Sequence, residues 1–470
     1  MSARTLFAKI WDDHKIRTIG DGVDLLHVDR HLIHDLVAGP VLQQLRQRGL
    51  SVAAPELSWA TPDHSVTTRS RLDRDGGNDI ARKLVTSMRT ETERAGIRIF
   101  DLGSEQQGIV HVVGPEMGIT LPGTLLLCGD SHTCTHGGLG ALSFGIGMSE
   151  VGHVLATQTI RQRRPKTMRI TIEGELSPMV TSKDVVLSII GRLGTAAGQG
   201  FAVEYAGSAV RAMDIEARMT LCNLSIELGA KVGMVAPDDK TFAYVAGRPY
   251  APRKGAELEA AIDYWRTLPS DAGAVFDVEH VIATDEIAPQ VTWGTSPQDV
   301  IAVTGDIPDP ESCRTDVARS GTRAALDYMG LTGGGKIAGT PIDWVFIGSC
   351  ANGRISDLRL AASVVANRKV AANVTAIVVP GSQQVKRQAE AEGLDRIFRD
   401  AGFEWHDSGC ALCVAANGLH VGPGERSVST SNRNFVGRQG PRARTHLANP
   451  ATAAAAAIAG TIVDPRDLVN

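Results

Sequence analysis

The sequence has little of what marks secreted or membrane-spanning proteins. Its 470 residues include seven cysteines, an odd and sparse set that is unlike the disulfide framework of a secreted protein. No apolar run reaches the roughly 18 residues that a membrane-spanning helix needs. Residues 1–13 carry several charges around a short apolar stripe, without the apolar core or the cleavage site of a signal peptide. We therefore predict a cytoplasmic protein.

Charge and composition exclude further classes. The formal net charge is −4 and no long basic run is present, which argues against a dedicated nucleic-acid-binding protein. Hydrophobic residues make up 43% and charged residues 21%, so wholesale disorder and a fibrous architecture are excluded. Aromatic residues reach only 4%, whereas the 50 glycines predict many tight turns and places where the backbone approaches a ligand closely.

Short apolar runs alternate with amphipathic segments of helical length, which predicts an α/β fold. The length predicts about three domains. A basic, proline-containing stretch at 161–166 and a proline-rich stretch at 287–310 mark the expected boundaries. We predict three α/β domains that span residues 1–165, 166–300 and 301–470.

Two of the apolar runs lead directly into polar residues. The run at 125–128 is followed by Gly-Asp-Ser-His, and the run at 344–347 is followed by Gly-Ser-Cys. Ligands gather at the carboxyl ends of the strands in open parallel sheets. Both points are therefore predicted walls of a binding site.

Cys410 and Cys413 form a C-x-x-C motif. Its spacing is compatible with a redox dithiol, with half of a zinc site or with part of an iron–sulfur site. The sequence has no second C-x-x-C motif, and Cys350, at the end of a predicted strand, is the best-placed third thiol. Three thiolates on a four-iron cluster would leave one iron open to act on a substrate as a Lewis acid. Spacing alone leaves all three readings open.

Histidines next to aspartates are candidates for proton transfer, because a carboxylate can orient an imidazole and raise its pKa. The candidates are Asp63 with His64 and Asp130 with His132, together with His111. The ordinary alternative is a hydrogen-bonded structural histidine.

Two further segments contain residues that could bind a ligand. Arg433 and Arg438 lie in a glycine- and asparagine-rich loop and would suit the carboxylates of a small acidic substrate, although a solvated loop is the simpler explanation. The segment 330–337 nearly matches a phosphate-binding loop. However, Ile337 replaces the required Ser or Thr and a helix-like segment precedes it, so nucleotide binding is rejected.

Taken together and in this order, four motifs resemble the aconitase family: DSHT at 130–133 with the glycines after it, GSCANGR at 348–354, GCALC at 409–413 and SNRNFVGR at 431–438. The likeness covers nearly the whole chain. The segments 145–159, 290–295 and 307–310 are similar in particular to the large subunits of bacterial isopropylmalate isomerases.

The resemblance implies a [4Fe–4S] cluster on Cys350, Cys410 and Cys413, with one iron free for substrate. It also implies roles for further residues. The pair that protonates the departing hydroxyl would be Asp63 and His64. The groups that order the iron-bound water would be Asp130, His132, His111 and Glu227. Asparagines near the cluster would be Asn223, Asn352 and Asn432. Substrate-binding residues would be His34, Ser131, Arg433 and Arg438.

The activity that the resemblance implies is that of a hydro-lyase. It would convert 2-isopropylmalate to 3-isopropylmalate through isopropylmaleate, in leucine biosynthesis. The aconitase-like fold would comprise three domains around a central cluster site and lack the fourth, swivelling domain, which a separate small subunit would supply together with the base.

Three alternatives remain. Ala351, Val436 and Gly152 depart from common family residues, so a paralogue could act on homocitrate or on another 2-substituted malate. RNA binding by a cluster-free form is a second alternative, and an electron-transfer module with four thiolates is a third.

Overall fold

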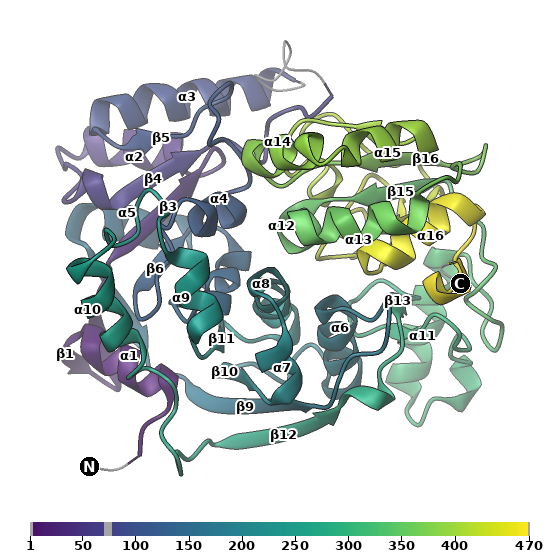
Figure 1. Cartoon of the computed structure of the whole chain (residues 1–470), viewed down its shortest axis with the longest axis horizontal. Coiled ribbons are helices and arrows are strands. Elements are labelled where there is room, and N and C mark those ends of the chain that lie inside the picture. The colour runs from purple at the N-terminus through teal and green to yellow at the C-terminus, as the bar shows by residue number, and fades with distance from the viewer. Residues whose placement is uncertain (1–2, 70–77, 469–470) are drawn as a thin grey trace. The chain divides into compact units, whose positions relative to one another are not determined.

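The computed structural model describes residues 3–69 and 78–468 (Figure 1). The chain forms two compact units, and each combines separate stretches of sequence. Unit 1 comprises Met1–Ser65, Asp75–Glu175 and Ala196–Ala283, and unit 2 comprises Val66–Arg74, Leu176–Thr195 and Thr284–Asn470. The division into domains at about 165 and 300 stays a prediction. Within the described ranges, no helix has the length and apolar character needed to cross a membrane.

The first sheet of unit 1 is parallel and has five strands. Their order is β5 (Arg98–Ile99), β4 (Ser58–Thr61), β3 (Arg30–His34), β6 (Leu125–Cys128) and β7 (Leu142–Gly145). Strands β4 and β6 are buried along their whole length, as expected for a parallel sheet with both faces covered. The helices of this part are α2 (Ala38–Gln47), α3 (Asp79–Ala95), α4 (Val110–Glu116) and α5 (Met148–Thr157), and α2 packs on both α3 and α5.

A second parallel sheet in unit 1 has the order β11 (Val232–Val235), β10 (Phe201–Ala206), β9 (Lys166–Glu173) and β12 (Val278–Ala283). Along β9 every second residue is buried, which is the two-residue period of a strand. The helices around it are α7 (Ser208–Ala212), α8 (Ile215–Asn223), α9 (Asp239–Val245) and α10 (Ala256–Trp265). A third, antiparallel sheet is formed by β1 (Lys15–Gly20), β2 (Val23–His27) and β8 (Thr159–Arg163), next to α1 (Leu6–His14).

The 3₁₀ segment η2 (Ser131–Leu139) links the two parallel sheets of unit 1, because it packs against β7, β11 and α8. Two glycines permit this approach. A Cβ atom at Gly137 would overlap the carbonyl oxygen of Gly233 in β11, and one at Gly138 would lie 2.7 Å from the backbone nitrogen of Met219 in α8. The glycines after the DSHT motif therefore serve close backbone packing.

Unit 2 contains a parallel sheet in the order β17 (Glu404–Trp405), β16 (Thr375–Val378), β15 (Trp344–Ile347), β18 (Arg426–Ser429) and β19 (Arg444–Leu447). Its helices are α6 (Ser182–Leu193), α11 (Asp316–Met329), α12 (Ser349–Asn352), α13 (Ile355–Val365), α14 (Gln383–Ala391), α15 (Leu394–Ala401) and α16 (Pro450–Ala459). The alanines of α16 are mostly fully buried, and these small side chains let the helix pack against α13 and β15. The hairpin β13 (Gln290–Thr292) and β14 (Val300–Ala302) completes the sheets of the unit.

Candidate active site

Polar groups follow three neighbouring parallel strands of unit 1. Strand β3 ends at His34 and leads into Asp35, β4 leads into Asp63 and His64, and β6 leads into Asp130. Because these strands run parallel, their carboxyl ends lie at the same edge of the sheet. The site wall expected after residues 125–128 lies at this edge.

Asp35 organises the segment that carries the expected acid pair. Its Oδ1 accepts hydrogen bonds from the backbone nitrogens of Asp63 (3.0 Å) and His64 (3.1 Å), and its Oδ2 accepts one from that of Ser65 (2.7 Å). Burial alone would raise the pKa of Asp35, but the His64 and His34 rings and the N–H donors lower it to about 2. This residue was not expected from the sequence, although its place directly after a strand end was a signal.

His64 lies between two carboxylates. Its Nδ1 donates to Oδ1 of Asp63 (2.5 Å), and its Nε2 lies 3.2 Å from Oδ2 of Asp130. The other oxygen of Asp63 accepts from the backbone nitrogen of Val110 (2.9 Å). Burial disfavours the imidazolium, yet the two carboxylates outweigh burial and raise the pKa of His64 well above its ordinary value. These contacts orient the His64 ring and favour its protonated, hydrogen-bond-donating form.

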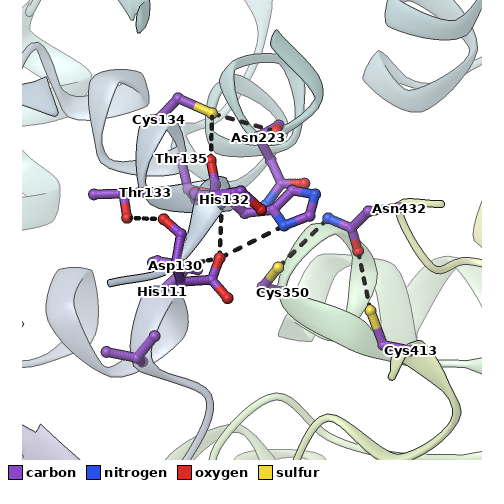
Figure 2. Close-up of polar contacts among 12 residues, drawn as sticks. His111, Asp130, His132, Thr133, Cys134, Thr135, Asn223, Cys350, Cys413 and Asn432 are labelled. Carbon is purple, nitrogen blue, oxygen red and sulfur yellow. Dashed lines mark hydrogen bonds and ion pairs between the residues drawn. The ribbon is translucent and has the colours of Figure 1, made fainter. Parts of the chain in front are cut away.

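Asp130 also accepts hydrogen bonds on its other oxygen. Oδ1 accepts from His111 Nε2 (3.0 Å) and from the backbone nitrogen of His132 (2.7 Å), whose side chain lies close by in Figure 2. Burial would raise the pKa of Asp130, but its bonds with His111, His132 and His64 lower it well below the ordinary value. The carboxylate thus stays ionised although it is surrounded by protein.

His111 titrates in the opposite direction from His64. Burial lowers its pKa and outweighs the attraction of Asp130. Its Nδ1 lies 3.1 Å from Nε2 of His136, whose Nδ1 lies 2.7 Å from the Thr120 hydroxyl. Neutral imidazoles satisfy this chain when Thr120 donates to His136, His136 donates to His111, and His111 donates to Asp130. His136 and Thr120 were not expected from the sequence.

The remaining expected residues of unit 1 lie near this network. His132 Nε2 is 3.2 Å from Oε1 of Glu227, and Asn223 donates to the Thr135 hydroxyl at 2.7 Å. The ring centroids of His34 and His64 are 4.5 Å apart. His34 is 2% exposed, and neither of its ring nitrogens has a hydrogen-bond partner in the part of the chain that the structure describes. Ser131 is partly buried at the start of η2.

In unit 2 the three predicted thiols follow strands of one parallel sheet. Cys350 comes after β15, whereas Cys410 and Cys413 come after β17, and all three are buried. Asn432 comes after β18 and joins two of them: its Nδ2 donates to Cys350 Sγ (3.4 Å), and Cys413 Sγ donates to its Oδ1 (3.5 Å) (Figure 2). Ser349, next to Cys350, has a φ of 82°, a left-handed conformation that is typical of functional sites.

Neighbouring polar groups support the backbone around Cys350. The Arg354 side chain is buried, and its Nη1 donates to the Cys350 carbonyl oxygen at 2.7 Å. Asn352 donates from Nδ2 to Asp357 Oδ1 at 2.9 Å, and its own Oδ1 is buried with no partner among the described residues.

The two expected carboxylate-binding arginines lie on the loop after β18. Arg433 is partly buried. The guanidinium carbon of Arg438 lies 5.3 Å from the centroid of the Phe435 ring, and its Nε is buried with no hydrogen-bond partner in the described ranges. The structure therefore gathers the predicted site residues into two groups, one within each unit.

The family model described as aconitase family (aconitate hydratase) matches residues 8–460. The chain belongs to the aconitase family. It is 60% identical over 465 residues to a Bradyrhizobium diazoefficiens protein named 3-isopropylmalate dehydratase large subunit 1, covering 99% of this chain and 97% of that relative. A crystal structure of Thermococcus kodakaraensis aconitase X in its holo form aligns with 91% of this chain and 89% of that chain, at 10% identity and a TM-score of 0.47. The resemblance and the aconitase-like α/β fold expected from the sequence are confirmed.

Proposed function

We propose that this chain is the large subunit of a 3-isopropylmalate dehydratase. This hydro-lyase of leucine biosynthesis would convert 2-isopropylmalate to 3-isopropylmalate through isopropylmaleate. The observation that carries the proposal is the 60% identity, over nearly the whole of both chains, to a protein with that name. The acid–base groups of unit 1 and the thiols of unit 2 supply the kinds of residue that the reaction needs.

Aconitase-family enzymes generally use a [4Fe–4S] cluster, and we propose Cys350, Cys410 and Cys413 as its ligands here. Zinc bound by thiolates would need sulfur atoms about 3.8 Å apart, given a Zn–S distance of about 2.3 Å. Among the described residues, His34, Asp35, Asp63 and His64 are the one group of at least three His, Cys, Asp or Glu residues whose ligand atoms all lie within 4.8 Å of one another. The three thiols do not form such a group, which supports a cluster over a single ion. When bound, the cluster supplies a Lewis-acid iron.

The residues of this chain would supply the proton chemistry and the binding of substrate. Hydroxide is a poor leaving group, so elimination needs a proton donor, and the protonated His64 held by Asp63 and Asp130 suits that role. Arg433 and Arg438 would bind the substrate carboxylates. His34, whose ring nitrogens lack partners among the described residues, would contact the substrate.

The remaining roles concern water, the cluster surroundings and the partner. We propose that Asp130, His111, His132 and Glu227 order the reacting water, and that Asn223, Asn352 and Asn432 surround the cluster. Ser131 would bind substrate at the start of η2. The relative named above is a large subunit, which supports a small subunit as partner.

The ligand assignment is tested by anaerobic reconstitution of single Cys→Ser variants. Iron, sulfide and the broad visible absorption should be lost in Cys350→Ser, Cys410→Ser and Cys413→Ser. Cys313→Ser is the matched control in unit 2, and Cys128→Ser, Cys134→Ser and Cys222→Ser are controls in unit 1; all four should keep the cluster. Stoichiometric zinc in anaerobically purified protein would refute the assignment.

The acid role of His64 is tested with His64→Ala in the reconstituted two-subunit enzyme. Loss of a general acid costs about 10²- to 10⁴-fold in rate, so turnover of 2-isopropylmalate should fall by that factor while the visible absorption of the cluster persists. Turnover equal to that of the native enzyme would exclude His64 as the acid.

A further inference from the structure

Unit 2 contains a fully buried cationic side chain that was not expected from the sequence. Lys183, near the start of α6, is 0% exposed. Its Nζ donates to the carbonyl oxygens of Thr430 (2.9 Å) and Ser431 (2.6 Å). It forms no ion pair with a carboxylate within the described ranges. A buried ammonium without a charged partner is costly, so its surroundings must compensate for it.

The two carbonyl groups that Lys183 binds lie directly before Asn432. Thr430 is further fixed to the turn before Cys350, because its hydroxyl donates to the Gly348 carbonyl oxygen (2.9 Å) and its own carbonyl oxygen accepts from the Ser349 hydroxyl (3.1 Å). Asn432 then extends between the sulfurs of Cys350 and Cys413, as Figure 2 shows. The ammonium therefore holds the turn that brings an amide group to two of the proposed ligands.

The electrostatic surroundings of Lys183 consist of thiols and acids. Burial lowers the pKa of Lys183 to about 8, and Cys413, Asp357, Cys350 and Asp184 oppose this effect. Asp184 is engaged elsewhere. Its oxygens accept from the Asn449 side chain (2.6 Å) and from the backbone nitrogens of Gln290 (2.8 Å) and Thr181 (2.7 Å).

We propose that Lys183 is a positioning residue for the cluster site, which orders Asn432 against Cys350 and Cys413 and places a buried positive charge beside the cluster. The proposal rests on the cluster assignment of the proposed function. A nearby cation stabilises the more negative, reduced form of an iron–sulfur cluster and so raises its reduction potential. Removal of the charge should lower that potential.

The test measures the reduction potential of the reconstituted chain by a dithionite titration followed by electron paramagnetic resonance. Lys183→Met removes the charge and the hydrogen bonds, whereas Lys183→Gln keeps a donor without the charge. We expect each substitution to lower the equilibrium constant for reduction of the cluster about tenfold. For a one-electron couple this lowers the reduction potential by about 59 mV. The matched control is Lys9→Met in unit 1, because Lys9 is also buried and its Nζ also donates to two carbonyl oxygens, those of Thr267 (2.8 Å) and Pro269 (2.6 Å). Its potential should equal that of the native chain.

The outcomes separate the inference from the proposed function. Equal potentials in the native chain and both Lys183 variants would overturn the inference and leave the cluster assignment intact. Another outcome is a variant that fails to hold the cluster although its cluster-free form unfolds at the same urea concentration as the cluster-free native chain. That result would support the inference. If both cluster-free variants unfold at a much lower urea concentration than the cluster-free native chain, Lys183 is a purely structural residue and the inference is overturned. A native chain that takes up no cluster would refute the proposed function, and the inference with it.

Discussion

Asp35 is a single carboxylate that fixes the geometry of the candidate acid. It accepts hydrogen bonds from three successive backbone nitrogens, at Asp63, His64 and Ser65. The segment is thereby held so that the His64 ring lies between Asp63 and Asp130. The role of Asp35 is indirect, because it positions the chain that carries the acid.

Replacement of Asp35 by Asn should destabilise the chain measurably. The amide keeps one acceptor but places an NH₂ group opposite the buried backbone N–H of Ser65, which loses its partner. We expect the free energy of unfolding at pH 7 to fall by about 1–3 kcal/mol, measured by urea denaturation.

This loss should depend on pH. The folded-state pKa of Asp35 is lowered from 3.8 to about 2, so its stabilisation is present above about pH 4 and is lost as the pH falls toward about 2. The difference between the native chain and Asp35→Asn should therefore shrink as the pH is lowered from 5 to 3. A difference that does not change over this range would contradict the assigned charge.

The same residue type has opposite properties at His64 and His111, which shows how the surroundings determine chemistry. Both rings are buried, but His64 contacts two carboxylates and His111 contacts one carboxylate and another imidazole. The pKa of the first is raised and that of the second is lowered. Opposite pKa shifts of neighbouring groups are typical of sites in which one group acts as an acid and another stays neutral.

At the scale of elements, η2 shows how a sequence motif serves packing and chemistry together. Asp130 caps the segment, since its side chain accepts from the backbone nitrogen of His132. Gly137 and Gly138, a few residues later, let the segment contact β11 and α8. The close packing of η2 fixes the position of the histidines in between.

A methyl group at Gly138 should disturb this packing. In Gly138→Ala the Cβ would meet the backbone of Met219, which cannot rotate away, and overpacking of this kind costs about 1–3 kcal/mol. The midpoint of urea unfolding should fall accordingly, and turnover should fall with it as His132 is displaced.

The matched control for that variant is Gly321→Ala. Gly321 lies in α11, and no atom would lie within 4 Å of a new Cβ. Because alanine favours a helix interior over glycine, this variant should be more stable by about 0.5–1 kcal/mol. A Gly138→Ala chain as stable as the native one would show that η2 can shift.

At the scale of the whole molecule, the candidate residues are divided between the two units. The acid network belongs to unit 1, and the thiols, the arginines and Lys183 belong to unit 2. The groups assigned above include an acid and carboxylate-binding residues but no base for removal of the α-proton. The relative is named a large subunit, and we propose that a separate small subunit supplies this base.

We therefore predict that the reconstituted chain alone is nearly inactive on 2-isopropylmalate. Addition of a cognate small subunit should restore activity saturably, at one small chain per large chain, in an assay of isopropylmaleate absorbance. Fast turnover by the chain alone, with its cluster intact, would show that the base lies within this sequence.

The sequence alone determined the α/β class, the strand ends at 125–128 and 344–347, and the family. These features depend on local periodicity and on short motifs, which a linear sequence displays directly. It also identified His64, Asp130 and Cys350 as candidates, because each stands in or beside a motif.

Only the tertiary structure decided which groups meet. Asp35 contacts residues 63–65, His64 is shared between Asp63 and Asp130, and Lys183 reaches the carbonyl groups at 430 and 431. It also determined that residues 66–69 and 176–195 belong with the C-terminal part of the chain. Contacts between residues far apart in sequence, and the burial that shifts their pKa values, arise from packing of whole elements, which no local pattern encodes.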